Sequence, residues 1–253
     1  LLDSLGRMGL LSASETPRIE ALTGGVSSDI FRVDLPQGPI CIKRALARLK
    51  VSADWFAPVE RNLNEVAYLR YAAGVIPGAV PSILASDEQG LAFAMPYLAP
   101  DQHPVWKNEL RDGRVDLGLA RQVGDTLGRL HAASARDREL PARFATDASF
   151  HALRLEPYLA ATAARHPDHA ARLMHLLELT ARTRRVLVHG DVSPKNILCG
   201  PNGPVLLDAE CAWFGDPAFD LAFCLNHLLL KTLWRPAHAE SFGQAFEALA
   251  KAY

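Results

Sequence analysis

The chain has 253 residues, of which 49% are hydrophobic and 22% charged, so it is long enough to bury a sizeable core. A formal net charge of −1 excludes the strongly basic surface expected of proteins that bind nucleic acid or an anionic membrane. No apolar run is long enough to cross a bilayer, and the four cysteines are too scattered for a zinc site or a redox dithiol. These features predict a cytoplasmic protein.

The first hundred residues predict a small antiparallel sheet with one helix. The runs IFRVDL (30–35) and ICIKRAL (40–46) flank a turn of proline and glycine, which is typical of a hairpin. The segment VERNLNEVAYLRYAAG (59–74) has apolar residues at helical spacing and ends at Gly74, a residue typical of helix C-caps. Residues 80–100 predict a second hairpin.

From Pro100 the pattern changes to long amphipathic helices. The segment LARQVGDTLGRLHAAS (119–134) places its apolar residues on one face, together with His131, for which we expect a structural role. The segment ARLMHLLELTARTRR (171–185) predicts a second core-facing helix. The change of pattern predicts an N-terminal lobe at 1–98 and a C-terminal lobe at 99–253, and we expect the chain to be part of a longer protein.

A cluster of polar residues interrupts the apolar run VLVHGDVSPKNILCG (186–200). Asp191 and Asn196 lie between two stretches that are apolar enough to be buried strands, so a rigid scaffold would hold them. Asp208 and Glu210 follow the next apolar run, VLL. Two carboxylates and an amide that converge from neighbouring strands suit Mg²⁺ better than zinc.

A magnesium site that shares its ligands with phosphate oxygens requires a phosphate cradle elsewhere in the chain. A turn of glycines and small polar residues near the first strand is the candidate, because glycines let backbone amides approach phosphate closely. The candidate residues are Gly24, Gly25, Ser27 and Ser28. This turn is not a Walker loop, since no Gly-Lys-Ser/Thr follows it. The candidate lysine for contact with the phosphates is instead Lys43, on the next predicted strand. Glu65, on the following predicted helix, is the candidate acidic partner of this lysine.

These residues, in this order, resemble the aminoglycoside phosphotransferase and choline kinase branch of the protein-kinase-like fold. The resemblance extends from about Leu22 to Leu225, and HGDVSPKNIL followed by LLDAECAWFGDPAFDLA is its specific part. It implies a two-lobed α+β fold, with a small antiparallel-sheet N-lobe and a mainly helical C-lobe. It also implies phosphorylation of a hydroxyl on a small molecule, with ATP and Mg²⁺ as cofactors.

The resemblance assigns catalytic roles to three residues. Asp191 is expected to orient the attacking hydroxyl, while Asn196 and Asp208 are expected to bind Mg²⁺. Glu210 is a further candidate metal ligand. Asp220 is expected to brace the catalytic loop.

The resemblance also implies a nucleotide site. Lys43, held by Glu65, is expected to contact the α- and β-phosphates. The backbone of the segment between the lobes is expected to receive adenine, at Met95, Tyr97 and Leu98.

Two alternatives stay open at this point. A protein kinase is disfavoured because Asp220 follows Asp208 by only 12 positions, which leaves no room for a long activation segment. A nucleotide-binding scaffold without turnover is disfavoured by the retention of Asp191, Asn196 and Asp208.

The sequence does not select the acceptor: choline, a methylthioribose-like sugar, homoserine or another metabolite all fit. Acidic residues are sparse after Asp220, which disfavours a polycationic aminoglycoside without excluding it. The sequence also leaves open the roles of His189 and Lys195, the choice between ATP and GTP, and the oligomeric state.

Overall fold

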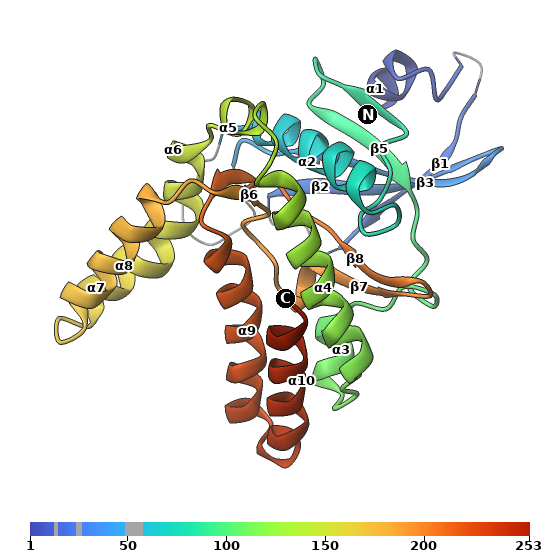
Figure 1. Ribbon diagram of the computed structural model, residues 1–253. Coiled ribbons are helices and arrows are strands. Elements are labelled where there is room, and N and C mark those ends of the chain that lie inside the picture. The colour runs from blue at the N-terminus through green and yellow to red at the C-terminus, as the bar shows by residue number, and fades with distance from the viewer. Residues whose placement is uncertain (13–14, 24–26, 49–57) are drawn as a thin grey trace.

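The computed structural model describes residues 1–12, 15–23, 27–48 and 58–253 of the chain. The N-terminal part is a five-stranded antiparallel sheet in the order β1-β2-β3-β5-β4 (Figure 1). Its strands are β1 (Arg18–Leu22), β2 (Ser28–Leu35), β3 (Gly38–Ala45), β4 (Ala85–Asp87) and β5 (Ala92–Pro96).

The two faces of this sheet are covered by different helices. On one face, Leu5 of α1 (Leu2–Arg7) packs in a cluster with Ile40 and Ile42 of β3. On the other face, α2 (Arg61–Val75) covers the residues that alternate with these isoleucines, among them Lys43. The alternation of a β-strand thus directs a lysine towards the helix, although its neighbours enter the core.

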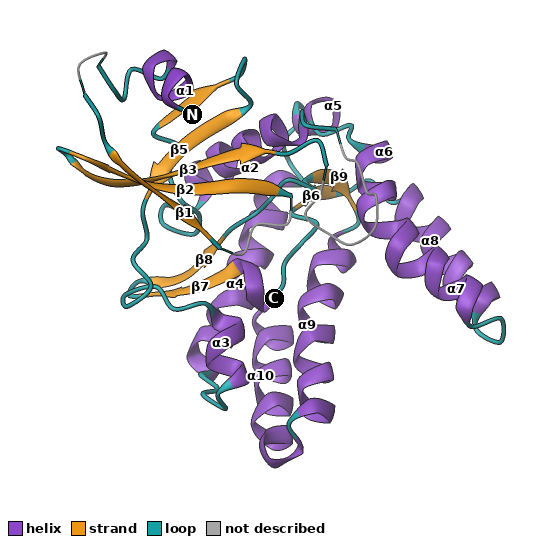
Figure 2. Ribbon diagram, turned by 180° about the vertical axis from the view of Figure 1, so that it is seen from behind, coloured by secondary structure: helices purple, strands orange, loops and turns teal. Residues whose placement is uncertain are grey.

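The C-terminal part is mainly helical (Figure 2). Its longer helices are α4 (Leu117–Ser134), α8 (Ala170–Arg182), α9 (Pro217–Trp234) and α10 (Ala239–Ala252). Its shorter helical segments are α3 (Trp106–Arg111), α5 (Leu140–Arg143), α6 (Asp147–Phe150), the π-helical segment η1 (His151–Ala160), α7 (Ala161–Arg165), η2 (Pro194–Asn196) and η3 (Pro236–His238).

Two short antiparallel strand pairs carry the loops of the candidate site. The strand β6 (Val186–Val188) pairs with β9 (Trp213–Gly215), and β7 (Ile197–Gly200) pairs with β8 (Gly203–Leu206). In Figure 1, α4 runs beside β7 and β8, with α9 and α10 next to its lower part, whereas α7 and α8 project away from these strands. The loops between these short strands are thereby anchored on a helical base.

One hydrophobic core spans both parts of the chain. It contains Leu69 of α2 and Phe93 of β5 together with Trp106 of α3, Leu127 of α4 and Leu249 of α10. Sheet and helices are therefore joined by shared apolar burial as well as by the connecting segment after β5.

The predicted α+β architecture, with a sheet first and helices after it, is confirmed, but the sequence missed β1. All but one of the β1 residues are exposed, so the strand has no apolar alternation and is held by its pairing with β2. The helix predicted to stop at Gly74 continues to Val75. No helix in the described ranges is both long and apolar enough to span a membrane.

The prediction for residues 171–185 was wrong in one respect. The segment forms α8 as expected, but only Leu177 and Thr180 of this helix are buried. Met174, Leu176 and Leu179 are exposed, because α8 packs mainly on η1 and α7 at the edge of the molecule.

Two glycine substitutions test the packing of α4 against α10. A Cβ atom at Gly124 would clash with the backbone carbonyl of Leu249, so Gly124→Ala should lower the free energy of unfolding by roughly 1–3 kcal/mol. The matched control is Gly243 in α10, where nothing lies within 4 Å of the added methyl group. There the better helix propensity of alanine should raise stability by about 0.5–1 kcal/mol. Urea unfolding checks both, and equal effects would contradict the close contact.

Candidate active site

A buried carboxylate holds the loop between β6 and η2. Asp220, in the first turn of α9, is fully buried, and it accepts hydrogen bonds from the backbone N–H groups of His189 (2.7 Å) and Gly190 (2.8 Å). Pro217 at the helix start and the capping Asp216 begin α9 just before this residue. The brace expected between Asp220 and the loop is therefore present.

His131 extends this brace to α4 and to the end of the chain. Its Nε2 lies 3.2 Å from a carboxylate oxygen of Asp220, and its Nδ1 lies 2.8 Å from the Tyr253 hydroxyl. The structural role expected of His131 is consistent with these two contacts. One carboxylate thus joins α4, α9 and the loop.

His189 is enclosed beside the same carboxylate. Its ring packs edge-on against Tyr68 at 5.1 Å, and its Nδ1 accepts a hydrogen bond from the backbone N–H of Asp191. Burial lowers the pKa of His189, although Asp220 acts in the opposite direction. A neutral ring that accepts from the backbone serves to shape the loop.

Gly190 is required by the shape of this loop. Its φ of +80° is in the left-handed region, and a Cβ atom there would lie 2.6 Å from the carbonyl oxygen of Cys211. The loop therefore turns sharply between His189 and Asp191.

Asp191 is buried, and one of its two carboxylate oxygens is saturated. Its Oδ2 accepts from Asn196 Nδ2 at 2.8 Å, and Arg154 Nη2 and Lys195 Nζ both lie 3.1 Å from it. No hydrogen bond to Oδ1 is found within the described ranges. The carboxylate is thus fixed through one oxygen and free to accept a hydrogen bond at the other.

Arg154 is a buried residue that the sequence did not single out. It belongs to η1, a π-helical segment, and its Nε donates to the carbonyl oxygen of Gly190. Its Nη2 meets Asp191, so one guanidinium binds both the backbone and the side chain of the loop. Such wide helical turns are rare and occur frequently at functional sites. No sequence pattern predicts one here, and Pro157 within the segment disfavours a regular helix.

Lys43 bridges the sheet, α2 and the C-terminal part. Its ammonium is almost fully buried, lies 2.7–2.8 Å from the Glu65 carboxylate oxygens and bonds Asp208 Oδ1. Burial opposes the charge, but Asp208 and Glu65 raise the pKa of Lys43 above its ordinary value. Burial likewise opposes ionisation of Asp208, but Lys43 lowers the Asp208 pKa to about 2. Both groups are charged at neutral pH.

Asp208 has an unusual backbone conformation. Its φ of +67° is in the left-handed region, which a residue other than glycine adopts at a cost in energy. Leu207 N–H also donates to the backbone carbonyl of Asn196 at 2.8 Å, so the two loops are bonded to each other. Strain of this kind is frequent where a side chain must be aimed at a ligand.

The donor set of Asn196 and Asp208 fits a hard divalent cation. Asn196 uses its amide nitrogen for Asp191, and no hydrogen bond from a described residue reaches Asn196 Oδ1 or Asp208 Oδ2, so both oxygens could ligate a cation. The described residues contain no group of three or more His, Cys, Asp or Glu side chains that would form a complete protein cage. A cation bound by these two residues would complete its shell with water and phosphate oxygens, as Mg²⁺ commonly does.

Glu210 has a different partner. Arg61 Nε donates to its carboxylate at 2.9 Å, and this buried arginine also donates to the backbone carbonyls of Ser27 and Leu46. Glu210 therefore neutralises the charge of Arg61, whose hydrogen bonds connect α2 to the backbone beside β2 and β3. Its role as a metal ligand stays a prediction, as does any substrate contact.

The remaining nucleotide-site candidates that the structure describes lie at the ends of two interior strands, β2 and β5. Ser27 and Ser28 are buried where β2 begins, whereas Gly24 and Gly25 lie outside the described residues.

The segment predicted to receive adenine lies at the end of β5. Met95 is in this strand, and Tyr97 and Leu98 follow it. The backbone N–H of Tyr97 donates to the backbone carbonyl of Pro39 at 3.4 Å. The Arg32 guanidinium lies 4.7 Å from the Tyr97 ring centroid.

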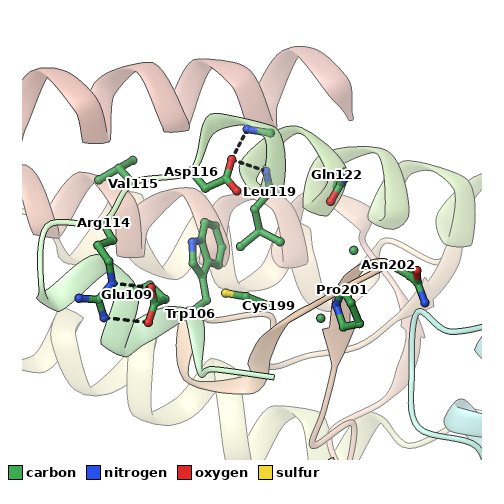
Figure 3. Close-up of a pocket in the computed structure, with 13 residues that line it drawn as sticks. Trp106, Glu109, Arg114, Val115, Asp116, Leu119, Gln122, Cys199, Pro201 and Asn202 are labelled. Atoms are coloured by element: carbon green, nitrogen blue, oxygen red, sulfur yellow. Dashed lines mark hydrogen bonds and ion pairs between the residues drawn. The ribbon is translucent and has the colours of Figure 1, made fainter. Parts of the chain in front are cut away.

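A cavity of about 680 Å³ lies apart from these residues. Figure 3 shows it between α3, the start of α4 and the β7–β8 hairpin, with the Glu109–Arg114 ion pair and the helix-capping Asp116 on one side. Its lining contains none of the predicted site residues. It is therefore separate from the candidate active site.

Comparison with known proteins gives a consistent family. The family model described as "Phosphotransferase enzyme family" matches residues 18–252. Methylthioribose kinase 1 from Oryza sativa subsp. japonica is 22% identical over 250 residues, which cover 88% of this chain and 58% of that protein. The chain thus spans less than two thirds of the length of this curated relative.

Solved structures share the fold at low identity. Amicoumacin kinase, solved in complex with AMP-PNP, Ca²⁺ and Ami, matches with a TM-score of 0.65 and 16% identity, over 98% of this chain and 75% of that one. Choline kinase from Streptococcus pneumoniae matches with a TM-score of 0.55 and 16% identity, over 96% of this chain and 78% of that one. The two-lobed protein-kinase-like fold expected from the sequence is confirmed.

The pair of Lys43 and Asp208 predicts how stability depends on pH. The Asp208 pKa is about 2 in the folded chain, below its ordinary value of 3.8, so its contribution to stability is present above pH 4 and is lost as the pH falls towards 2. The contribution is at most about 2 kcal/mol. Urea unfolding between pH 5 and 2 should therefore show a shallower loss of stability in Asp208→Asn than in the wild type. Parallel curves would contradict the ion pair.

Proposed function

Because this chain belongs to the phosphotransferase enzyme family, we propose that it transfers the γ-phosphoryl group of ATP to a hydroxyl of a small molecule, with Mg²⁺ as cofactor. The observation that carries the proposal is the buried contact of Lys43 with both Glu65 and Asp208, beside a loop that presents Asp191 and Asn196. Phosphoryl transfer depends mainly on positioning and charge, and these groups supply both.

The nucleotide would bind between the sheet and the loops. Lys43 projects from strand β3 and is held by Glu65 of α2. From this position its ammonium would contact the α- and β-phosphates. Met95, Tyr97 and Leu98 would offer backbone groups to adenine, and the turn that leads to Ser27 and Ser28 would cover the phosphates.

Asn196 and Asp208 would hold Mg²⁺ through their free oxygens. The bound cation would neutralise charge on the phosphates. Lys43 would then keep Glu65 as its partner while Asp208 turns an oxygen to the metal, which the double contact of Lys43 allows.

Asp191 would orient the acceptor. Its Oδ2 is fixed by three donors, and its Oδ1 would accept a hydrogen bond from the attacking hydroxyl and then receive its proton. Arg154 and Lys195 would hold the carboxylate and add positive charge close to the transferred group. Lys195 is therefore proposed as a residue that acts on both Asp191 and phosphate.

A protein acceptor is disfavoured by the short segment after the metal site. The strand β9 (Trp213–Gly215) is the one regular element between Asp208 and the start of α9, within this described stretch. A platform for a peptide has no place in so short an interval.

ADP release from ATP and Mg²⁺ across a panel of amino alcohols, sugars, hydroxy acids and aminoglycosides tests the proposal. We expect at least one acceptor to stimulate ADP release, and Asp191→Asn to reduce that rate by roughly 10²-fold or more while AMP-PNP binding is retained.

The matched control is Asp125→Asn, which alters an exposed i,i+4 pair with Arg129 and should leave the rate unchanged. A chain that binds no nucleotide, or an Asp191→Asn variant as active as the wild type, would contradict the proposed function.

A further inference from the structure

One face of α9 leads away from the catalytic loop. Asp220, His227 and Lys231 are separated by seven and four positions, so they share this face of the helix. Asp220 holds the loop at one end. At the other end Arg235 Nη1 donates to the backbone carbonyl of Arg111 at 2.6 Å, which brings α9 to α3. The face therefore extends from Asp191 towards α3.

Lys231 is the unusual residue on this face. Its relative exposure is 9%, yet its ammonium makes no hydrogen bond or ion pair with any described residue. Burial and the nearby charge of Lys107 lower the pKa of Lys231. Lys231 Nζ is not among the fully buried nitrogen atoms that lack a partner in the described residues, so the aliphatic stem is packed while the ammonium stays within reach of a ligand. An anionic ligand would supply the missing partner.

Other cationic or titratable side chains surround the same place. The elements that carry these side chains adjoin one another, since α3 packs against η2 and the residue after α9 is hydrogen-bonded to α3. The charges of three lysines and Asp191 act on His227 at this place. The lysines come from three elements, since Lys107 is on α3, Lys195 on η2 and Lys231 on α9. Asp191 is paired with Lys195 and Arg154, whereas neither Lys107 nor Lys231 has an ion pair with a carboxylate of the described residues. We call Lys107, Lys195, His227 and Lys231 the α9 cation cluster.

We infer that the α9 cation cluster binds an anionic group, a carboxylate or a phosphate, carried by the small molecule whose hydroxyl lies at Asp191. The inference rests on the proposed function, because it places the acceptor on the loop side of α9. His227 lies seven residues after Asp220, about 10 Å along the helix, so the acceptor is of metabolite size. Hydroxy acids and phosphorylated sugars or polyols fit this chemistry, whereas cationic acceptors meet charge of their own sign.

The test uses the whole chain with AMP-PNP and Mg²⁺ bound, so that phosphate-bearing probes do not enter the nucleotide site. Isothermal titration at constant ionic strength compares glycerol, glycerate, glycerol 3-phosphate and choline. We expect glycerate or glycerol 3-phosphate to bind, the better of the two identifying carboxylate or phosphate, and glycerol and choline to bind at least about tenfold more weakly.

Variants of Lys231 then locate the binding. Lys231→Met should weaken anion binding about tenfold or more, and Lys231→Arg should retain most of it. Lys251→Met, which alters an exposed pair with Glu247 on α10, is the matched control and should bind like the wild type. Without ligand, Lys231→Met should melt at the same temperature as the wild type or higher, because it replaces an unpaired charge on a mostly buried side chain with an apolar group.

Three results would overturn the inference: choline or glycerol binding as tightly as the anions, neither anion binding at millimolar concentration, or wild-type anion affinity in Lys231→Met. Failure of the proposed function is distinguishable, since it would appear as absent AMP-PNP binding in the first titration. In that case glycerate titrated into the nucleotide-free chain still tests the cluster.

Discussion

The buried ammonium of Lys43 is the interaction on which the arrangement of the site depends. It lies between the carboxylate of Glu65 on α2 and the carboxylate of Asp208, which follows β8. These two contacts fix the position of the sheet relative to the C-terminal part. Removing Lys43 would leave two neighbouring carboxylates without their shared partner, which costs far more than the loss of an exposed pair. The two carboxylates repel each other, and the ammonium between them offsets this repulsion.

The loop that carries Asp191 is held by side chains from outside the loop. Asp220 fixes its backbone, and His131 and α4 hold Asp220 in turn. On this support Asp191 has one oxygen saturated and one open, which is what a group that orients a hydroxyl requires. The cost of burying so many charges is offset by pairing within the site. The lysine on α9 that lacks such a pair is therefore informative about the acceptor.

Several of these features could be predicted from the sequence, because they depend on local order along the chain. The hairpins, the helix with Glu65 and the loop with Asp191 follow from alternation, helical spacing and the resemblance of short motifs. Arg154 could not be predicted, because its role arises from a π-helical turn that brings η1 onto the loop. The pairing of Arg61 with Glu210 joins residues 149 positions apart and has no local signal. The edge strand β1 was missed because water, rather than a core, covers most of its side chains.

The most direct test of the account is calorimetric binding of AMP-PNP to the wild type and to Asp208→Asn, each with Mg²⁺ and with EDTA in its place. If Asn196 and Asp208 bind a metal that bridges the phosphates beside Lys43, Mg²⁺ should tighten binding to the wild type by about tenfold or more, and most of this gain should vanish in the variant. Equal affinity with and without Mg²⁺ in the wild type would contradict the metal-bridged nucleotide site, as would a gain that the variant retains in full.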